Sequence, residues 1–227
     1  MAPEVARLGH VALETPDLEG SLYFFRDTVG LEVVDRVAGT VYLRGVDEHD
    51  HHSLSLTEAD EARVDHIGWQ TEQPEHVEEF AEELGDRGIE ITRIDEETEP
   101  GQGAAIRFEI PNGHRFELYG EMEKPDPPEE RRSKLKNRVY DPSGNNPIAP
   151  ARIDHVQIWD PDGFECAEWI RDVLGFQVQE YYDEDDGSRW GAFLSACEVK
   201  IDVAVVQSEN ATDDAALHHV AYKVDTP

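Results

Sequence analysis

The sequence predicts an α+β fold built from tandem βαβββ modules. The main observation is an internal repeat, in which LGHVALETPDLEGSLYFFRDTVGLEVV aligns with IDHVQIWDPDGFECAEWIRDVLGFQVQ. His10 matches His155 in the two copies, and Gly30 matches Gly175 at the same interval. In each copy an alternating run is followed by a helical stretch, a glycine and a second alternating run. Self-similarity of this kind is typical of a repeated structural unit.

Two weaker copies of the repeat begin at VDHIGWQT and at LHHVAYKV. Four segments therefore open on a predicted strand that carries a histidine, and these histidines are His10, His66, His155 and His219.

The first module covers residues 7–60. Val11 and Leu13 alternate with polar or small residues, as in a half-buried strand. Asp17 is a predicted N-cap, apolar residues then recur at helical spacing, and Gly30 ends the helix. The strands that follow are predicted at 31–37, 41–44 and 53–57.

The later modules repeat this order. In the second module, 64–120, the predicted helix is 74–86, the strands are 89–94, 104–110 and 114–119, and PNGH forms a tight turn. In the third module the predicted helix is 164–174, and the strands are 176–182, 190–194 and 200–206. The fourth module is only begun, and it would need roughly another 50 residues to match the second.

These modules suggest two domains. The first is 5–122, and the second is 151–227, with the third module complete. The proline-rich segment 123–150 is predicted to connect them along the surface. It carries a basic cluster, which we expect to contact the acidic body of the protein or of a neighbouring subunit, and which comprises Arg131, Arg132, Lys134 and Lys136.

The chain of 227 residues is strongly acidic, with 51 acidic and 20 basic residues and a net charge of −31. Such a surface repels nucleic acid and anionic lipid, and it suits solubility in high salt, which indicates a halophilic source. The two cysteines, Cys166 and Cys197, indicate no disulfide scaffold. We find no leader and no apolar run near the ~20 residues that span a bilayer, so a cytoplasmic protein is expected.

If two modules pair about a pseudo-twofold axis, the histidines of their first strands project into one trough. In HRFELYG, Glu117 alternates with apolar neighbours, so its side chain is predicted to point to the opposite face of the strand from theirs. A buried strand glutamate is costly unless it meets a cation. Two imidazoles and one carboxylate leave three adjacent octahedral positions open, the arrangement that suits Fe(II) and O₂ chemistry. The alternative is that His66 and Glu117 form an internal hydrogen-bonded pair.

The repeat and the segments LGHVAL, PNGHRFELYG, IDHVQI, LGFQVQE, WGAFLS and LHHVAY resemble the vicinal oxygen chelate superfamily. More closely, the chain is similar to the two-domain extradiol ring-cleaving dioxygenases. The resemblance implies modules of the glyoxalase, bleomycin-resistance and dihydroxybiphenyl-dioxygenase type, paired into curved mixed sheets. It also implies a metal-dependent enzyme of aromatic catabolism, which cleaves a small aromatic diol with O₂ and assembles as a homo-oligomer.

The resemblance implies that the C-terminal modules hold Fe(II) through His155, His219 and a glutamate expected beyond Pro227. His218 is then expected to face away, with Phe193 and Trp190 as candidate pocket walls. Relatives carry a proton-handling histidine where this chain has Ile201, and losing such a group typically costs ~10²–10⁴ in rate.

The alternative metal set lies in the first half: His10, His66 and Glu117, with His51 near the position of the catalytic acid/base. Here Arg107 stands where the family places a strand tyrosine. The alternative functions are a non-redox enzyme of the same superfamily, using Mn(II), Ni(II), Co(II) or Zn(II), and a non-catalytic binding protein.

Overall fold

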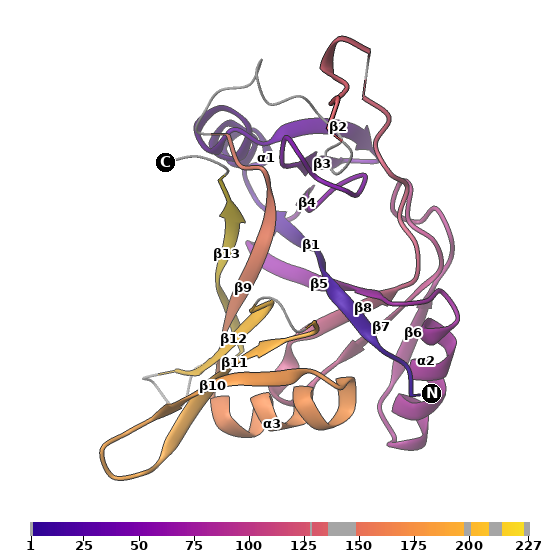
Figure 1. The fold of residues 1–227 in the computed structure, drawn as a ribbon. Helices are drawn as coiled ribbons and strands as arrows, with labels where there is room; N and C mark the ends of the chain where they lie inside the picture. The colour runs from indigo at the N-terminus through magenta and orange to yellow at the C-terminus, as the bar shows by residue number, and fades with distance from the viewer. Residues whose placement is uncertain (1, 128, 136–148, 198–200, 209–214, 225–227) are drawn as a thin grey trace.

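The computed structural model describes residues 2–127, 129–135, 149–197, 201–208 and 215–224, and its strands form two mixed sheets (Figure 1). The first sheet has the order β2-β3-β4-β1-β5-β8-β7-β6, and the second has the order β10-β11-β12-β9-β13. The predicted α+β class and its βαβββ units are confirmed.

The first module contains β1 (Val5–Thr15), α1 (Leu18–Leu22), β2 (Glu32–Val37), β3 (Thr40–Arg44) and β4 (Leu54–Glu58). Asp17 caps α1 as predicted, because its carboxylate accepts from the Gly20 N–H at 2.9 Å. The predicted single helix differs in its second half, where Tyr23–Val29 is a π-helix. Gly30 ends it at φ 95°, a conformation that glycine adopts without strain.

The second module contains β5 (Arg63–Thr71), α2 (His76–Asp86), β6 (Ile91–Ile94), β7 (Ala105–Glu109) and β8 (Arg115–Tyr119). The buried face of α2 consists of Val77, Phe80, Ala81 and Leu84. The predicted PNGH turn is a short 3₁₀ segment, Pro111–Gly113, with Asn112 at φ 70°.

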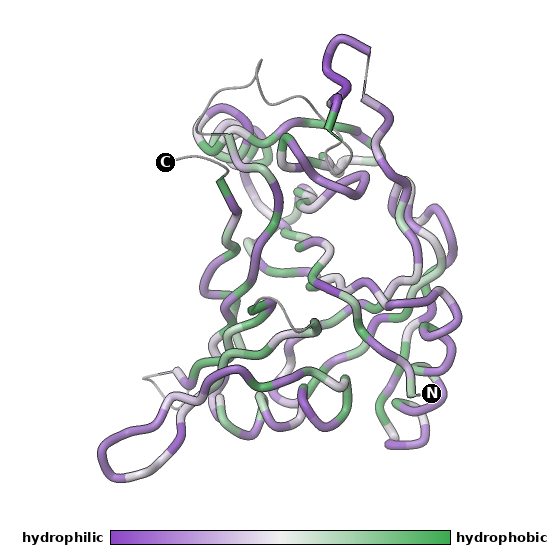
Figure 2. Tube along the Cα trace, viewed as in Figure 1, coloured by the Kyte–Doolittle hydropathy of each residue, from purple (hydrophilic) through white to green (hydrophobic). Residues whose placement is uncertain are grey.

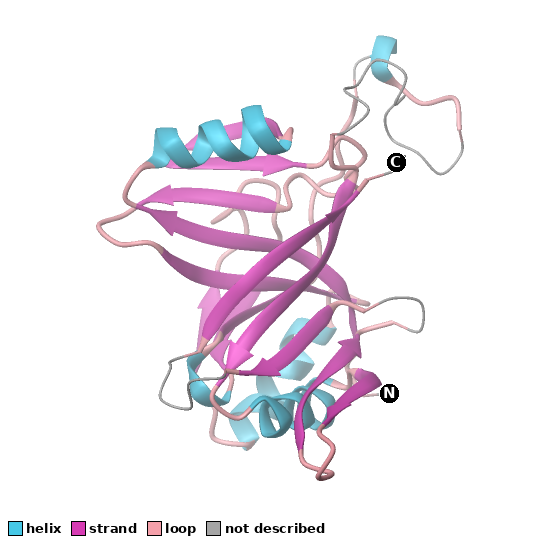
Figure 3. Ribbon diagram, turned by 90° about the vertical axis from the view of Figure 1, so that its left-hand side faces the viewer, coloured by secondary structure: helices cyan, strands magenta, loops and turns pink. Residues whose placement is uncertain are grey.

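The last part contains β9 (Arg152–Asp160), α3 (Gly163–Leu174), β10 (Gln177–Asp183), β11 (Arg189–Ser195), β12 (Val203–Gln207) and β13 (Ala216–Lys223). The predicted strand 200–206 begins later, at Val203, and Lys200 lies outside the described residues. The helices lie on the outside of the strands, and the tip of the β10–β11 hairpin is hydrophilic (Figures 2 and 3).

The opening strands of neighbouring modules pair in an antiparallel manner, β1 with β5 and β9 with β13. The register is equivalent in the two pairs. His10 lies opposite Gly68, two residues after His66, and His155 lies opposite Ala221, two residues after His219. Each sheet therefore brings two strand histidines to the same face at the same relative position.

A single hydrophobic core contains residues from both halves of the chain. Trp69 of β5, for example, packs edge-on against Phe176, with ring centroids 5.1 Å apart. Within the described residues, no helix combines the length and the apolar character that crossing a bilayer requires.

In the described part of the 123–150 segment, Arg131 contacts the acidic body of the protein as expected, whereas Arg132 contacts an acidic residue of the segment itself. Arg131 pairs with Glu32 of β2 at 2.7 Å, and Arg132 pairs with Asp126 at 2.6 Å. Lys136 lies outside the described residues.

The loop between β3 and β4 holds the start of the second half. The Val46 and Asp47 N–H groups donate to the carbonyls of Pro150 and Ala151, each at 2.9 Å. The carboxylate of Glu48 accepts from the Ile153 N–H at 3.0 Å. Glu48 is almost fully buried, and this burial raises its pKa to about 7.

A pH dependence of stability follows from Glu48. The folded protein keeps this proton up to about pH 7, whereas the unfolded chain releases it near 4.5. The free energy of unfolding should therefore fall as pH rises between these values, by roughly 2–3 kcal/mol from this group. In thermal unfolding at pH 5 and pH 8, Glu48→Gln should lose this dependence and be the more stable protein at pH 8. Equal pH slopes for the two proteins would contradict the assignment.

Candidate metal centres

The C-terminal candidate site is the imidazole pair of His155 on β9 and His219 on β13. Their Nε2 atoms lie 3.4 Å apart, and the ring planes are nearly perpendicular, at 77°. Adjacent ligands at ~2.1 Å from one octahedral ion lie ~3.0 Å apart. The two nitrogens are therefore placed to share one divalent ion after a small adjustment.

The surroundings of this pair orient both rings. The Asp154 carboxylate lies 2.9 Å from Nδ1 of His155, which fixes the tautomer that leaves Nε2 free for a metal. His218 contacts His219 through Nδ1 atoms 2.7 Å apart, and its ring packs against Trp159. Burial, together with His155 and His218, lowers the pKa of His219, which favours the neutral ligand form.

The pair lies on an accessible face of the second sheet. The His155 side chain is 30% exposed. A row of directly paired residues crosses this face from strand to strand, and it consists of Phe193, Ala204, Gln157 and His219. Side chains in one such row share a face of the sheet, so Phe193 lies on the histidine face. Trp190 stacks on Tyr182, which in turn contacts Phe193.

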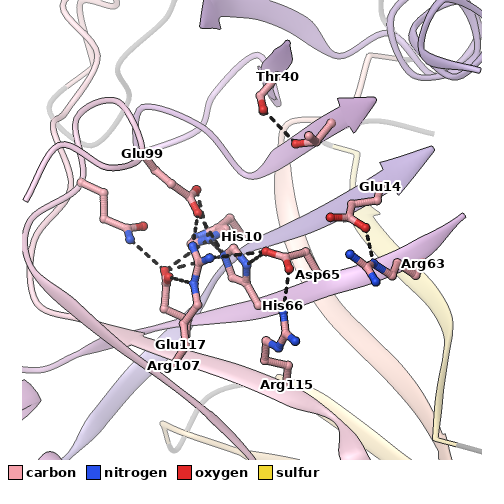
Figure 4. A network of polar contacts seen from close by, with 12 residues as sticks. His10, Glu14, Thr40, Arg63, Asp65, His66, Glu99, Arg107, Arg115 and Glu117 are labelled. Carbon is pink, nitrogen blue, oxygen red and sulfur yellow. Dashed lines mark hydrogen bonds and ion pairs between the residues drawn. The ribbon is translucent and has the colours of Figure 1, made fainter. Parts of the chain in front are cut away.

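The N-terminal candidate site is a closed cluster (Figure 4). Its ligand atoms lie within 4.8 Å of one another and come from the buried residues His10, His66, Glu99 and Glu117. The two Nε2 atoms are 2.9 Å apart, and Glu117 Oε1 lies 3.6 Å and 3.7 Å from those of His10 and His66. The structure therefore brings together the three residues of the alternative set and adds Glu99. Among the described residues this is the one group of three or more metal-ligating side chains so placed.

A guanidinium already lies against the carboxylates of this cluster. Arg107 of β7 donates through Nε to Glu117 and through Nη2 to Glu99, each at 2.5 Å, and its Nη1 lies 3.4 Å from Asp65 (Figure 4). The Gln102 amide donates to the other oxygen of Glu117 at 2.8 Å. Both glutamates thus meet a cation inside the protein, which removes the main cost of burying them.

The charges of the two N-terminal histidines differ. Burial lowers the pKa of His10 well below its usual range, so its ring is neutral. Burial alone would lower the pKa of His66 too, but Glu117, Asp65 and Glu99 raise it to about 9. His66 is thus a buried imidazolium that donates to Asp65 at 2.8 Å and to Nε2 of His10. Hydrogen bonds from His52 and His66 outweigh burial and hold the pKa of Glu99 well below its usual value.

One member of this cluster, Glu99, and one neighbour, His52, do not stand out in the sequence. Glu99 lies in EETEPGQG, between two strands, where alternation gives no information about direction. His52, not His51, lies beside the cluster, with Nε2 3.2 Å from Glu99 and its ring 5.1 Å from that of His10. His51 lies one residue further out, with its Nδ1 3.2 Å from Nδ1 of His52. The histidine doublet in HDHHSLSL is the only sign of this contact in the sequence, and it does not show whether His51 or His52 faces the cluster.

Ile201 precedes β12, and its neighbour Asp202 is buried. The Asp202 carboxylate accepts from the Ala196 N–H at 3.0 Å, a structural contact within the second sheet. Ile201 itself offers no group that can carry a proton.

Two family models match this chain. Residues 64–123 match the catechol 2,3-dioxygenase-like N-terminal domain, and residues 152–227 match the glyoxalase/bleomycin resistance protein/dioxygenase superfamily.

Known proteins align along nearly the whole chain. It is 47% identical to a manganese-dependent 2,3-dihydroxybiphenyl 1,2-dioxygenase of Geobacillus genomosp. 3, over 99% of this chain and 70% of that protein. It is 33% identical to a metapyrocatechase of Geobacillus stearothermophilus, over 99% of this chain and 67% of that protein.

Comparison with solved structures also finds extradiol dioxygenases. The homoprotocatechuate 2,3-dioxygenase of Arthrobacter globiformis superposes with a TM-score of 0.84 at 25% identity, over 97% of this chain and 64% of that one. A variant of the Brevibacterium fuscum enzyme gives 0.83 at 26%, over 97% and 57%. This chain thus spans less than two thirds of the length of these solved structures. From its modules, its paired strand histidines and these likenesses, the chain belongs to the metal-dependent extradiol ring-cleaving dioxygenases of the vicinal oxygen chelate superfamily.

Proposed function

We propose that the protein cleaves the ring of a catechol-type aromatic diol with O₂, outside the two hydroxyls, at a divalent metal held by His155 and His219. The observation that carries the proposal is the imidazole pair with Nε2 atoms 3.4 Å apart on an accessible sheet face. The 47% identity to a 2,3-dihydroxybiphenyl 1,2-dioxygenase supports the reaction class.

The C-terminal pair suits this role better than the N-terminal cluster. Ring cleavage needs a metal with open positions that a diol and O₂ can reach. The side chains of His10, His66 and Glu117 are fully buried, and Arg107 lies against their carboxylate. We therefore assign the alternative set to a structural role and keep His51 out of the chemistry.

The residues of this chain would act by holding the metal and the substrate in place. His155 and His219 would hold the ion, Asp154 would fix the ring of His155, and Phe193 would contact the aromatic ring of the substrate. A bound divalent metal supplies the redox-active Lewis-acid centre that this class of oxidation requires. Because Ile201 carries no proton, we expect another group or solvent to take over that task, with a slower rate than in relatives that carry a histidine.

Among the candidate metals, Fe(II) and Mn(II) suit the oxidation that we propose. Imidazole ligands bind both, and the pair His155 and His219 does not distinguish them. The resemblance seen in the sequence implies Fe(II), and this stays a prediction. The likeness to a manganese-dependent relative favours Mn(II), and we propose Mn(II) as the more active form.

A reconstitution experiment tests the function. Full-length protein, freed of metal by a chelator and kept anaerobic, would receive Mn(II), Fe(II), Ni(II), Co(II) or Zn(II), and then catechol or 2,3-dihydroxybiphenyl and air. We expect the yellow absorbance of a ring-opened product with Mn(II) and, to a smaller extent, with Fe(II). No colour with any metal, although one binds tightly, would support a non-redox enzyme. No metal binding at all would support a binding protein.

Three further properties belong to the proposal. The net charge of −31 supports a protein that works at high salt. We also propose a cytoplasmic location and a homo-oligomeric state.

A further inference from the structure

The two halves of the protein present the same pair of imidazoles but surround them differently. The pairing register of the strands gives the two histidine pairs the same relative position in their sheets. The two Nε2 atoms of a pair are 2.9 Å apart in the first half and 3.4 Å apart in the second. The first pair also has two glutamates within reach, so its ligand set is the richer of the two. The two glutamates of this set are already paired with a cation of the chain itself.

The cation beside the first pair of imidazoles is the guanidinium of Arg107. Arg107 on β7 lies directly opposite Glu117 on β8, so the two side chains share a face of the sheet. Its guanidinium reaches Glu117, Glu99 and Asp65, the three acidic side chains that surround the imidazoles. The fork geometry of arginine matches two carboxylates at once, which a lysine would not reproduce.

Three of the four ligands, Glu117, Glu99 and His66, would keep another support without this arginine. Glu117 is held by the Gln102 amide at 2.8 Å, Glu99 by His52 at 3.2 Å, and His66 by Asp65 at 2.8 Å. These contacts come from three segments of the chain and hold the ligand atoms in place from outside the cluster. Such outer contacts are what a metal site requires to keep its ligands oriented.

We propose that the N-terminal cluster is a latent divalent-metal site that the guanidinium of Arg107 keeps closed. Removal of this one cation leaves two imidazoles and two buried carboxylates whose negative charge is then only partly compensated, by His66. A divalent ion then replaces the guanidinium, held by His10, His66, Glu117 and Glu99. The inference does not depend on activity at the other site.

The test compares metal binding by the full-length protein and by Arg107→Met, with Co(II) as the probe. Both proteins would be stripped of metal, titrated by calorimetry and inspected for visible Co(II) absorption. We expect Arg107→Met to bind one equivalent more than the parent protein, whatever the parent binds. At Co(II) about a hundredfold above its dissociation constant, the variant's Tm should rise by roughly 5 °C more than the parent's.

Three controls isolate the effect of the guanidinium. Arg115→Met removes a positive charge from the same network, since Arg115 pairs with Asp65 at 2.8 Å, but it leaves Arg107 in place and should add no equivalent. Arg107→Met with Glu117→Gln removes a ligand carboxylate and should lose the additional equivalent. Arg107→Lys keeps a cation and should bind no additional metal.

Several results would overturn the proposal. A folded Arg107→Met protein that binds no additional Co(II) would do so. A parent protein whose Co(II) count falls by one in His10→Ala would show that Arg107 does not exclude metal. If Arg107→Met is recovered unfolded, folding on addition of Co(II) supports the proposal, and failure to fold at saturating Co(II) contradicts it.

Discussion

His219→Ala is expected to lower the rate of ring cleavage by more than about 10²-fold, because it removes one of the two imidazoles that face each other on β9 and β13. Replacing a residue that only supports a ligand typically costs 10–100-fold in affinity or activity, so direct loss of a ligand should exceed about 10². His155→Ala should have the same effect. Product formation at saturating metal and the bound metal per chain are the two measurements.

His218→Ala is the matched control, since it removes a neighbouring imidazole from the same strand. Its ring packs on Trp159 and lies beside His219 without facing His155, so we expect at most about a tenfold loss. If His218→Ala loses more activity than His219→Ala, the identities of ligand and neighbour are reversed. If neither histidine matters, and His10→Ala abolishes ring cleavage and metal binding in a protein that stays folded, the reaction belongs to the first half.

Arg107→Met is expected to destabilise the metal-free protein by about 3–5 kcal/mol, as measured by denaturant unfolding at constant salt. Glu117 has no exposed side-chain surface, and Arg107 is only 18% exposed, so the change leaves two buried carboxylates without their main cation. Breaking a buried ion pair by removing one partner typically costs this much.

The comparison for this prediction is again Arg115→Met, whose side chain is 45% exposed. An exposed ion pair contributes ~0–1 kcal/mol, so this variant should unfold close to the parent protein. Similar losses for the two variants would mean that net charge, and not the buried contacts, sets the stability.

Repetition and strand alternation predicted much of this fold. The four opening strands, the cap at Asp17 and the glycine stop at Gly30 follow from local patterns, and the structure has them all. The π-helical turn in Tyr23–Val29 was not predictable in this way, because the same apolar spacing fits an α-helix.

The site was predictable only where strands carry it. His10, His66 and Glu117 have directions set by alternation, and the structure brings them together. Glu99 and His52 approach the cluster from loops, whose paths depend on tertiary contacts. The opposing role of Arg107 depends on its pairing with Glu117 across two strands, which a single sequence does not reveal.

The shared register of the two strand pairs limits where this protein can gain or lose residues. A one-residue insertion within β9 or β13 would turn its histidine from the open face toward the helix side, because strand side chains alternate. The hydrophilic tip of the β10–β11 hairpin carries no such constraint (Figure 2). Labels, tags or natural length variation should therefore be tolerated at that tip and excluded from the opening strands.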